Sequence, residues 1–216
     1  MYNILCFGDS NTWGMDPKTL TRFPPEIRWT GILQNELGSD FKIIEEGLVG
    51  RTAFMSFPFE PEASGISYFL PCVKSHAPLD LIIIMIGTND FAYGATPLGI
   101  ARNLTRYIQT ARADTTGMTA PPQILLISPV QITKDFEKSP FQEIFGDVDA
   151  CIEKSKKYAD YVKMIAEENN CLWLDSSEVA PASETDGLHY DEKGHMGLGK
   201  KVAEIVKKVA CSTLDV

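Results

Sequence analysis

The stretch Leu81-Ile82-Ile83-Ile84-Met85-Ile86, followed at once by Gly87-Thr88-Asn89-Asp90, decides the fold class of this chain. Its apolar residues show no polar alternation, which is typical of a strand buried on both faces of a parallel sheet. The polar residues that follow then fall at the carboxyl end of that strand, where open parallel sheets bind their ligands. This one segment therefore indicates both the fold and the place to look for chemistry.

Four further apolar or β-branched runs indicate strands, and longer segments with helical spacing separate them. Apolar residues recur every three or four positions within three segments, and a helix is also expected to end before Gly38. Alternating strands and helices predict an α/β fold with a mostly parallel five-stranded sheet, covered by helices on both faces. The predicted strands are 2–7, 41–45, 81–86, 123–128 and 171–174, and the predicted helices include 28–37, 100–111, 152–165 and 198–209.

Length and composition are those of a globular protein. The chain has 216 residues, 44% of them hydrophobic and 23% charged. A chain of this size can bury a sufficient core without a metal or a disulfide, so we expect residues 1–216 to form a single domain. The net charge of −9, from 29 acidic and 20 basic side chains, disfavours nucleic acids and anionic membranes as partners.

Neither a membrane span nor a secretion signal is visible. The longest strongly apolar run, 81–87, is far shorter than the roughly 20 residues of a membrane-spanning helix. Strand-like residues begin at the N-terminus, without a basic leader region or a cleavage site. The cysteines are odd in number, scattered and free of any C-x-x-C pair, which indicates reduced thiols; they are Cys6, Cys72, Cys151, Cys171 and Cys211. We therefore expect a cytoplasmic protein.

Polar or glycine-containing blocks follow several of the predicted strands. Gly8-Asp9-Ser10-Asn11 follows the first strand, 47–52 the second and 87–90 the third, while Asp186-Gly187-Leu188-His189 lies beyond the fifth. Each block is weak evidence alone, because Gly-Asp-Ser is a common turn and serine is a favoured helix N-cap. Their joint position at one edge of the sheet is what points to a site.

The residue types in these blocks suit nucleophilic acyl chemistry. The hydroxyl of Ser10 needs a neighbouring base to accept its proton, and His189 can hold and return a proton near neutral pH. Asp186, three residues before His189, can reach the other ring nitrogen and orient the imidazole. The backbone N–H groups of Ser10 and Gly50, with the side-chain amide of Asn89, could stabilise a tetrahedral oxyanion.

Taken together, the four blocks resemble those of the SGNH, or GDSL-type, hydrolases, in the expected order and over nearly the whole chain. The stretches 4–10, 28–31, 44–48 and 79–85 are most similar to the GDSL aryl esterase/acyltransferase branch. The resemblance implies a flavodoxin-like three-layer α/β/α sandwich and ester hydrolysis through an acyl-enzyme, without a metal or another cofactor. It assigns Ser10 as nucleophile, His189 as base and Asp186 as its orienter, with Gly50 and Asn89 as oxyanion donors.

Asn11 is a departure from the pattern, since the family often has leucine there. Because Asn11 borders the nucleophile, asparagine in place of leucine is expected to affect which acyl groups the pocket accepts. Trp13 and Met15 lie just beyond and could wall that pocket, and Thr88 precedes the oxyanion donor Asn89. These four residues are the candidate substrate-binding residues.

Two segments and several polar residues have other expected roles. The stretch 129–146 holds no clear helix or strand and is predicted to be a lid or a binding loop. The aromatic segment 54–59 is expected to cover the site or to contact another subunit. The remaining polar candidates and one glycine are expected to be structural; they are Asp9, Gly47, His76, Asp90 and His195.

The sequence therefore predicts a serine esterase that hydrolyses short-chain acyl esters, such as acetyl or aryl esters, and whose partner is a small-molecule ester. Three alternatives stay open. The acyl group could be transferred to an alcohol instead of water, or the substrate could be an O-acetylated carbohydrate. A flavodoxin-like module that binds a ligand without catalysis is the non-enzymatic alternative. The identity of the ester and the oligomeric state, whether monomer or homo-oligomer, are left open.

Overall fold

A computed structural model describes residues 1–56, 61–113, 115 and 117–214 of the chain. Its five strands form one sheet in the order β2-β1-β3-β4-β5, and every neighbouring pair is parallel. This is the flavodoxin-like strand order, with its switch point between β1 and β3. The prediction of a five-stranded parallel sheet is confirmed. The strands are β1 (Tyr2–Gly8), β2 (Phe41–Gly47), β3 (Leu81–Met85), β4 (Gln123–Ser128) and β5 (Leu172–Asp175).

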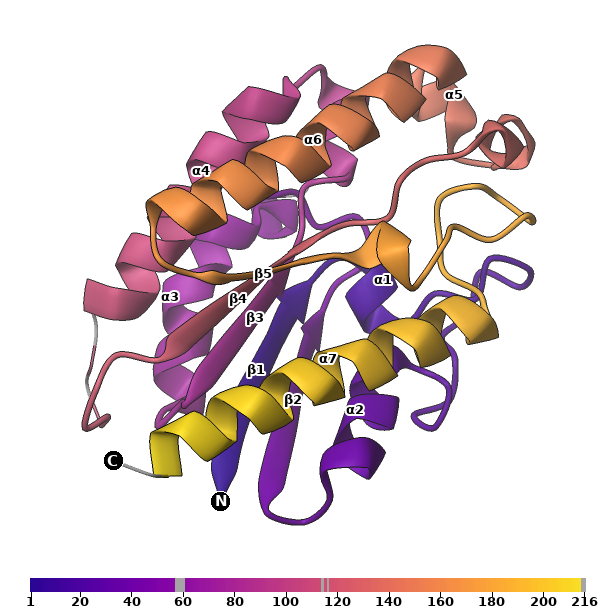
Figure 1. Ribbon diagram of the computed structural model, residues 1–216. Helices are drawn as coiled ribbons and strands as arrows, with labels where there is room; N and C mark the ends of the chain where they lie inside the picture. Colours follow the sequence, from indigo (N-terminus) through magenta and orange to yellow (C-terminus); the bar gives the residue numbers. More distant parts are fainter. Residues whose placement is uncertain (57–60, 114, 116, 215–216) are drawn as a thin grey trace.

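Helices cover both faces of the sheet, which gives the three layers visible in Figure 1. One face carries α3 (Gly65–His76), α4 (Pro97–Ala113) and α6 (Val148–Glu168), and the other carries α2 (Trp29–Leu37) and α7 (Glu192–Leu214). The predicted three-layer α/β/α sandwich is therefore confirmed. The remaining helical elements are short: α1 (Ser10–Trp13), α5 (Gln142–Phe145), η1 (Pro61–Ala63), η2 (Asn89–Tyr93), η3 (Lys134–Lys138) and η4 (Ser176–Glu178).

Strand β3 lies in the middle of the sheet, as its apolar run predicts. All five of its residues are buried, with at most 2% of any of them exposed. Ile82 and Ile84 join the core beneath α3, α4 and α6, whereas Leu81 and Ile83 join the core beneath α2 and α7. This division follows from the alternation of side chains along a strand. Two separate cores therefore hold the sheet between its helices.

The observed elements differ from the predicted ones mainly at their ends. Strands β1 and β2 continue to Gly8 and Gly47, where α1 packs directly against the backbone. A Cβ atom on Gly47 would lie 2.1 Å from the backbone nitrogen of Trp13. The stretch 129–146, expected to hold no clear element, contains η3 and α5. Helices of four or five residues are too short to leave a periodic pattern in a sequence.

Three further expectations concern the surface and the cysteines. Over the residues that the structure describes, no helix combines the length and apolarity needed to cross a membrane. Cys6, Cys72, Cys151 and Cys171 are free thiols, and the side chain of Cys211 lies outside the described part. In the segment 54–59, Phe54 packs against the core beneath α3, α4 and α6, and residues 57–59 lie outside the described residues.

Candidate active site

The turn between β1 and α1 presents Ser10 at the carboxyl edge of the sheet. Asp9 caps the helix, because its Oδ1 atom accepts a hydrogen bond of 3.0 Å from the backbone N–H of Asn11. Gly8 allows α1 to pack closely, since a Cβ atom there would lie 2.1 Å from the hydroxyl oxygen of Thr12. Ser10 is thereby fixed as the first residue of α1, with only 6% of its surface exposed.

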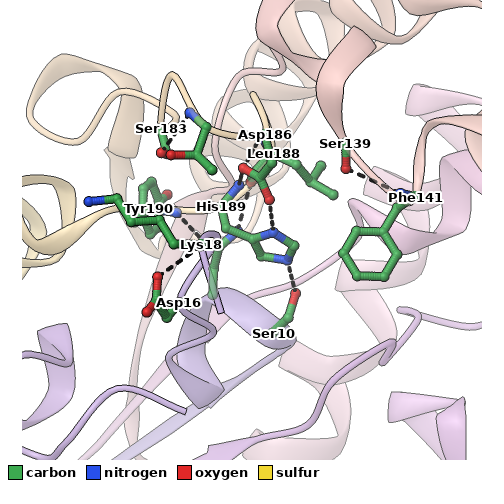
Figure 2. Close-up of polar contacts among 12 residues, drawn as sticks. Ser10, Asp16, Lys18, Ser139, Phe141, Ser183, Asp186, Leu188, His189 and Tyr190 are labelled. Atoms are coloured by element: carbon green, nitrogen blue, oxygen red, sulfur yellow. Dashed lines mark hydrogen bonds and ion pairs between the residues drawn. The ribbon is translucent and has the colours of Figure 1, made fainter. Parts of the chain in front are cut away.

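Ser10, His189 and Asp186 form one continuous hydrogen-bonded row (Figure 2). The hydroxyl oxygen of Ser10 lies 3.0 Å from Nε2 of His189, and Nδ1 of His189 lies 2.6 Å from Oδ2 of Asp186. The chain positions 10 and 189 are brought together from opposite ends of the sequence, whereas 186 and 189 share one loop. The structure thus brings together all three residues that the sequence selects as nucleophile, base and orienter.

The carboxylate of Asp186 is held in its charged form and in a fixed orientation. Its Oδ1 atom accepts hydrogen bonds from the backbone N–H groups of Leu188 and His189, at 3.1 and 3.0 Å. Burial raises the pKa of Asp186. The side-chain hydrogen bond and charge of His189, together with these N–H donors, lower the pKa by more than burial raises it, so it lies below its usual value. An ionised carboxylate can therefore fix the tautomer of the imidazole, leaving Nε2 to accept a proton from Ser10.

Gly187 allows the Asp186–His189 loop to pack against the stretch that precedes α5. Its φ angle is +61°, and a Cβ atom there would lie 2.2 Å from the backbone nitrogen of Phe136. Its carbonyl also accepts a hydrogen bond from the N–H of Thr133. The positive φ angle and the close approach of η3 both require glycine at this position, because a side chain would strain the backbone and collide with η3.

The two predicted oxyanion donors lie beside Ser10. Gly50, at a φ angle of +74°, and Asn89, the first residue of η2, line the same cavity as Ser10 and His189. The side-chain amide of Asn89 donates to the carbonyl of Arg51 at 2.9 Å, which ties it to the loop that carries Gly50. Because an amide nitrogen carries two hydrogens, its second N–H can be offered to a substrate.

This cavity measures about 120 Å³, and its polar and apolar parts are well separated. The polar lining consists of Ser10, Gly50, Asn89 and His189. The apolar wall comes from five separate parts of the chain and comprises Met15, Val49, Ala92, Tyr93, Phe141, Ile144, Phe145 and Leu188. A hydroxyl, an imidazole and two amide donors therefore meet at one end of a small apolar pocket.

Of the four candidate substrate-binding residues, the structure places only Met15 in the wall of this cavity. Asn11 is buried and binds the loop of His189 instead: its Nδ2 donates to the carbonyl of Leu188, and its Oδ1 accepts from the N–H of Tyr190, at 3.2 and 3.0 Å. Trp13 is stacked under the guanidinium of Arg22. Thr88 is buried at the start of η2, and its carbonyl accepts from the N–H of Phe91.

Residues 141–145 supply a wall that the sequence does not assign residue by residue. The aromatic ring of Phe141 packs edge-on against the imidazole of His189, with 5.8 Å between ring centres (Figure 2). Ile144 and Phe145 of α5 continue the wall. The only available signal is the length and aromatic content of 129–146, which predicts a binding loop but not which side chains face the site. Val49, Ala92 and Tyr93 give no signal in the sequence.

The carboxyls of Asp9 and Asp90 bond backbone amides around the site. Asp90 accepts from the N–H groups of Ala53, Phe54 and Met55, at 2.6, 3.2 and 3.4 Å. Burial raises the pKa of each of these two carboxyls to about 6, although the backbone donors oppose the shift. Both side chains therefore make the structural contacts that the sequence predicts.

The remaining two histidines lie outside the row described above. His195 is fully buried, and its Nδ1 atom accepts a hydrogen bond of 3.2 Å from the N–H of Trp29. Burial lowers its pKa to about 3, so the ring is neutral. His76, at the end of α3, pairs with Glu46 at 2.8 Å. Neither ring lines the cavity beside Ser10.

Comparison with known proteins agrees with this geometry. Residues 6–196 match the model of the GDSL-like Lipase/Acylhydrolase family. No curated protein matches the chain. Among solved structures, an aryl esterase from M. smegmatis is 36% identical, with a TM-score of 0.89 over 96% of this chain and 99% of that one. Est24, a carbohydrate acetylesterase from Sinorhizobium meliloti, is 31% identical, with a TM-score of 0.89 over 97% of this chain and 100% of the other.

A more distant structure shares the fold. A member of the lipolytic protein G-D-S-L family from Veillonella parvula is 19% identical, with a TM-score of 0.69 over 95% of this chain and 98% of that one. At this identity the likeness concerns the fold alone. The three-layer architecture thus persists where most of the sequence has changed.

Proposed function

Because this chain belongs to the GDSL-like lipase/acylhydrolase family and is a serine ester hydrolase, we propose that it cleaves short-chain acyl esters with Ser10, His189 and Asp186. Family membership makes it an enzyme rather than the non-catalytic binding module considered above. One observation carries the proposal: the unbroken row of contacts from the hydroxyl of Ser10 through the ring of His189 to the carboxylate of Asp186.

The proposed reaction has two steps. The hydroxyl oxygen of Ser10 attacks the carbonyl carbon of the ester while Nε2 of His189 takes the hydroxyl proton. The oxyanion is stabilised by the N–H groups of Ser10 and Gly50 and by the amide of Asn89. The C–O bond then breaks, and the leaving alcohol receives the proton from His189. Water next attacks the acyl-enzyme with His189 again as base, which releases the acid and restores the serine.

The size and lining of the cavity support short, apolar acyl groups. About 120 Å³ corresponds to roughly four water molecules at liquid density, which suits an acetyl or similarly short chain. The wall formed by Tyr93, Phe141, Ile144 and Phe145 offers aromatic and aliphatic surface to the rest of the ester. This lining favours an aryl ester, such as the similar aryl esterase acts on, over the polar ring of a carbohydrate acetate.

Replacement of the nucleophile tests the proposal directly. Ser10→Ala is expected to lower kcat for an activated aryl acetate by several orders of magnitude, because the remaining groups cannot form the acyl-enzyme. Ser39→Ala, at an exposed position, is the matched control and should retain wild-type turnover. A fluorophosphonate should label Ser10 alone, as mapped by mass spectrometry. Wild-type turnover by Ser10→Ala, or an adduct on another residue, would contradict the proposal.

A panel of esters and acceptors tests the finer points. We expect kcat/KM to be higher for aryl acetates than for acetylated sugars and to fall as the acyl chain lengthens. Adding a dilute apolar alcohol and measuring new ester against free acid separates acyl transfer from hydrolysis, because both reactions use the same acyl-enzyme. A preference for acetylated sugars would favour the carbohydrate acetylesterase alternative instead.

A further inference from the structure

Glu46, Cys72 and His76 form a compact cluster outside the cavity of Ser10. Glu46 is the next-to-last residue of β2, and Cys72 and His76 are four residues apart on α3. Residues at this spacing lie on one face of a helix. One ligand atom from each of the three side chains, a carboxylate oxygen, the sulfur and a ring nitrogen, lies within 4.8 Å of the others. Together they present an oxygen, a sulfur and a nitrogen donor to the same point.

The position of Glu46 follows from strand alternation. Successive side chains of a strand point to opposite faces, so Glu45 and Glu46 face different helices. Glu45 bonds Arg28 on the side of α2, with 2.7 Å between Nη2 and Oε2. Glu46 faces α3, where its Oε1 atom lies 2.8 Å from Nε2 of His76. The carboxylate of Glu46 is therefore already directed at two residues of α3.

This donor set is the one that zinc prefers. Zn²⁺ binds thiolate sulfur at about 2.3 Å, imidazole nitrogen at about 2.0–2.1 Å and carboxylate oxygen at about 2.0–2.2 Å. Donors around a tetrahedral ion with these bond lengths lie about 3.3–3.8 Å apart, and the three donor atoms here lie within 4.8 Å of one another. The ion has a path in, because the side chains of His76 and Glu46 remain 30% and 19% exposed and Glu46 lines an open cleft with Tyr68.

We propose that Glu46, Cys72 and His76 bind a zinc-type divalent cation, with a fourth position left to water from the cleft. Binding replaces the thiol proton of Cys72, which leaves to solvent as the sulfur–metal bond forms. The carboxylate and the thiolate neutralise the two charges of the ion, whereas the nearby guanidinium of Arg51 opposes it. None of the three ligands lines the cavity beside Ser10, so this ion takes no part in ester cleavage.

Cobalt provides the direct test, because a Co²⁺–thiolate bond gives a charge-transfer absorption that other ligands lack. After chelation and reduction, the full-length protein should take up one equivalent of Co²⁺ with this absorption, and Zn²⁺ should displace it. Cys72→Ala should abolish the band. Cys171→Ala should keep it, because this half-buried thiol directly precedes β5, at the opposite edge of the sheet from β2. Absence of the band in the wild type, or its survival in Cys72→Ala, would overturn the proposal.

A second variant covers the case in which Cys72→Ala fails to fold, since Cys72 is fully buried. His76→Gln changes a partly exposed side chain and should leave the fold and the esterase activity intact. Its Co²⁺ affinity should fall more than tenfold, and the rise in Tm that Zn²⁺ gives the wild type should disappear. Unchanged metal affinity in His76→Gln would refute the site, whatever the outcome for ester hydrolysis.

Discussion

At the scale of single residues, Asn11 has the most consequential contacts around the site. Its amide donates to the carbonyl on one side of His189 and accepts from the N–H on the other side, so it holds both peptide groups that flank the imidazole. Asn11 is also covalently next to Ser10. One side chain therefore fixes the backbone of the proposed base relative to the proposed nucleophile, a role that the leucine common in the family cannot fill.

Asn11→Leu is expected to lower kcat by up to about 100-fold with little change in KM, because a small displacement of a reacting group is enough for such a loss. Steady-state kinetics and the rate of fluorophosphonate labelling should fall together. Asn35→Leu makes the same replacement at an exposed position and should change neither. If Asn11→Leu loses only thermal stability and keeps the wild-type kcat, Asn11 is a structural residue and not a positioning one.

In the proposed reaction, the carboxylate of Asp186 acts through the imidazole of His189, which it contacts at 2.6 Å. Asp186→Asn keeps the size of the side chain but removes the charge that stabilises an imidazolium and selects its tautomer. We expect kcat to fall by about 10⁴-fold with the fold retained. Single-turnover acylation, followed by release of the aryl alcohol, measures this step, and circular dichroism checks the fold. A fall of less than tenfold would mean that another group orients His189.

At the scale of elements, α5 and the residues before it shape the cavity. Phe141→Ala removes the ring that packs against His189 and widens the pocket. We expect kcat/KM for longer acyl chains to rise relative to acetate, because the new space accepts additional methylenes. Leu98→Ala, on an exposed face of α4, is the control and should leave the chain-length preference unchanged. An unaltered preference in Phe141→Ala would place the acyl group elsewhere.

The elements that the sequence predicts are those that carry a regular pattern. The apolar run of β3 and the three-to-four spacing of α4, α6 and α7 reflect burial, which acts on every turn of an element. Helices η3 and α5 are held by contacts with distant loops, such as that of Phe136 with Gly187. No periodic pattern in the local sequence predicts these two helices. Their existence, and the wall that they supply, could only come from the tertiary structure.

At the scale of the whole molecule, topology explains why widely separated blocks could be predicted to meet. The carboxyl ends of parallel strands share one edge, so residues after β1, β2 and β3 and before α7 converge there. Topology fixes the edge but not the direction of each side chain. The position of Asn11 next to Ser10 in the sequence predicts a place in the acyl pocket. In the structure its side chain instead points to the loop of His189 and bonds the backbone there.

Three buried groups, the carboxyls of Asp9 and Asp90 and the imidazole of His195, should set the pH dependence of stability for the whole molecule between pH 4 and 6. Burial raises the pKa of Asp9 and of Asp90 to about 6, from an ordinary value of 3.8. Between pH 4 and 6 each of these carboxyls binds more protons in the folded chain than in the unfolded one, so each lowers the free energy of unfolding as pH rises, by about 3 kcal/mol. The imidazole of His195 offsets a similar amount over the same window, because its folded pKa of about 3 lies below its ordinary value of 6.5, so the net decline is about that of one carboxyl. Asp186 has the opposite sign: its pKa is lowered, so its contribution is lost only as pH falls below about 4.

Asp9→Asn keeps the oxygen that accepts from the N–H of Asn11 but cannot ionise. Urea unfolding from pH 4 to 6 should therefore show that the decline in stability of the wild type largely disappears, because the opposite contribution of His195 then offsets that of Asp90. The measured quantity is the slope with pH, because the buried amide that replaces the second carboxyl oxygen adds a cost that is the same at every pH. Asp40→Asn, at an exposed carboxyl, should leave the slope unchanged. A wild-type slope in Asp9→Asn would show that Asp9 is already ionised at pH 4 in the folded chain, and the turn before Ser10 would then hold a buried negative charge throughout the working range of the enzyme.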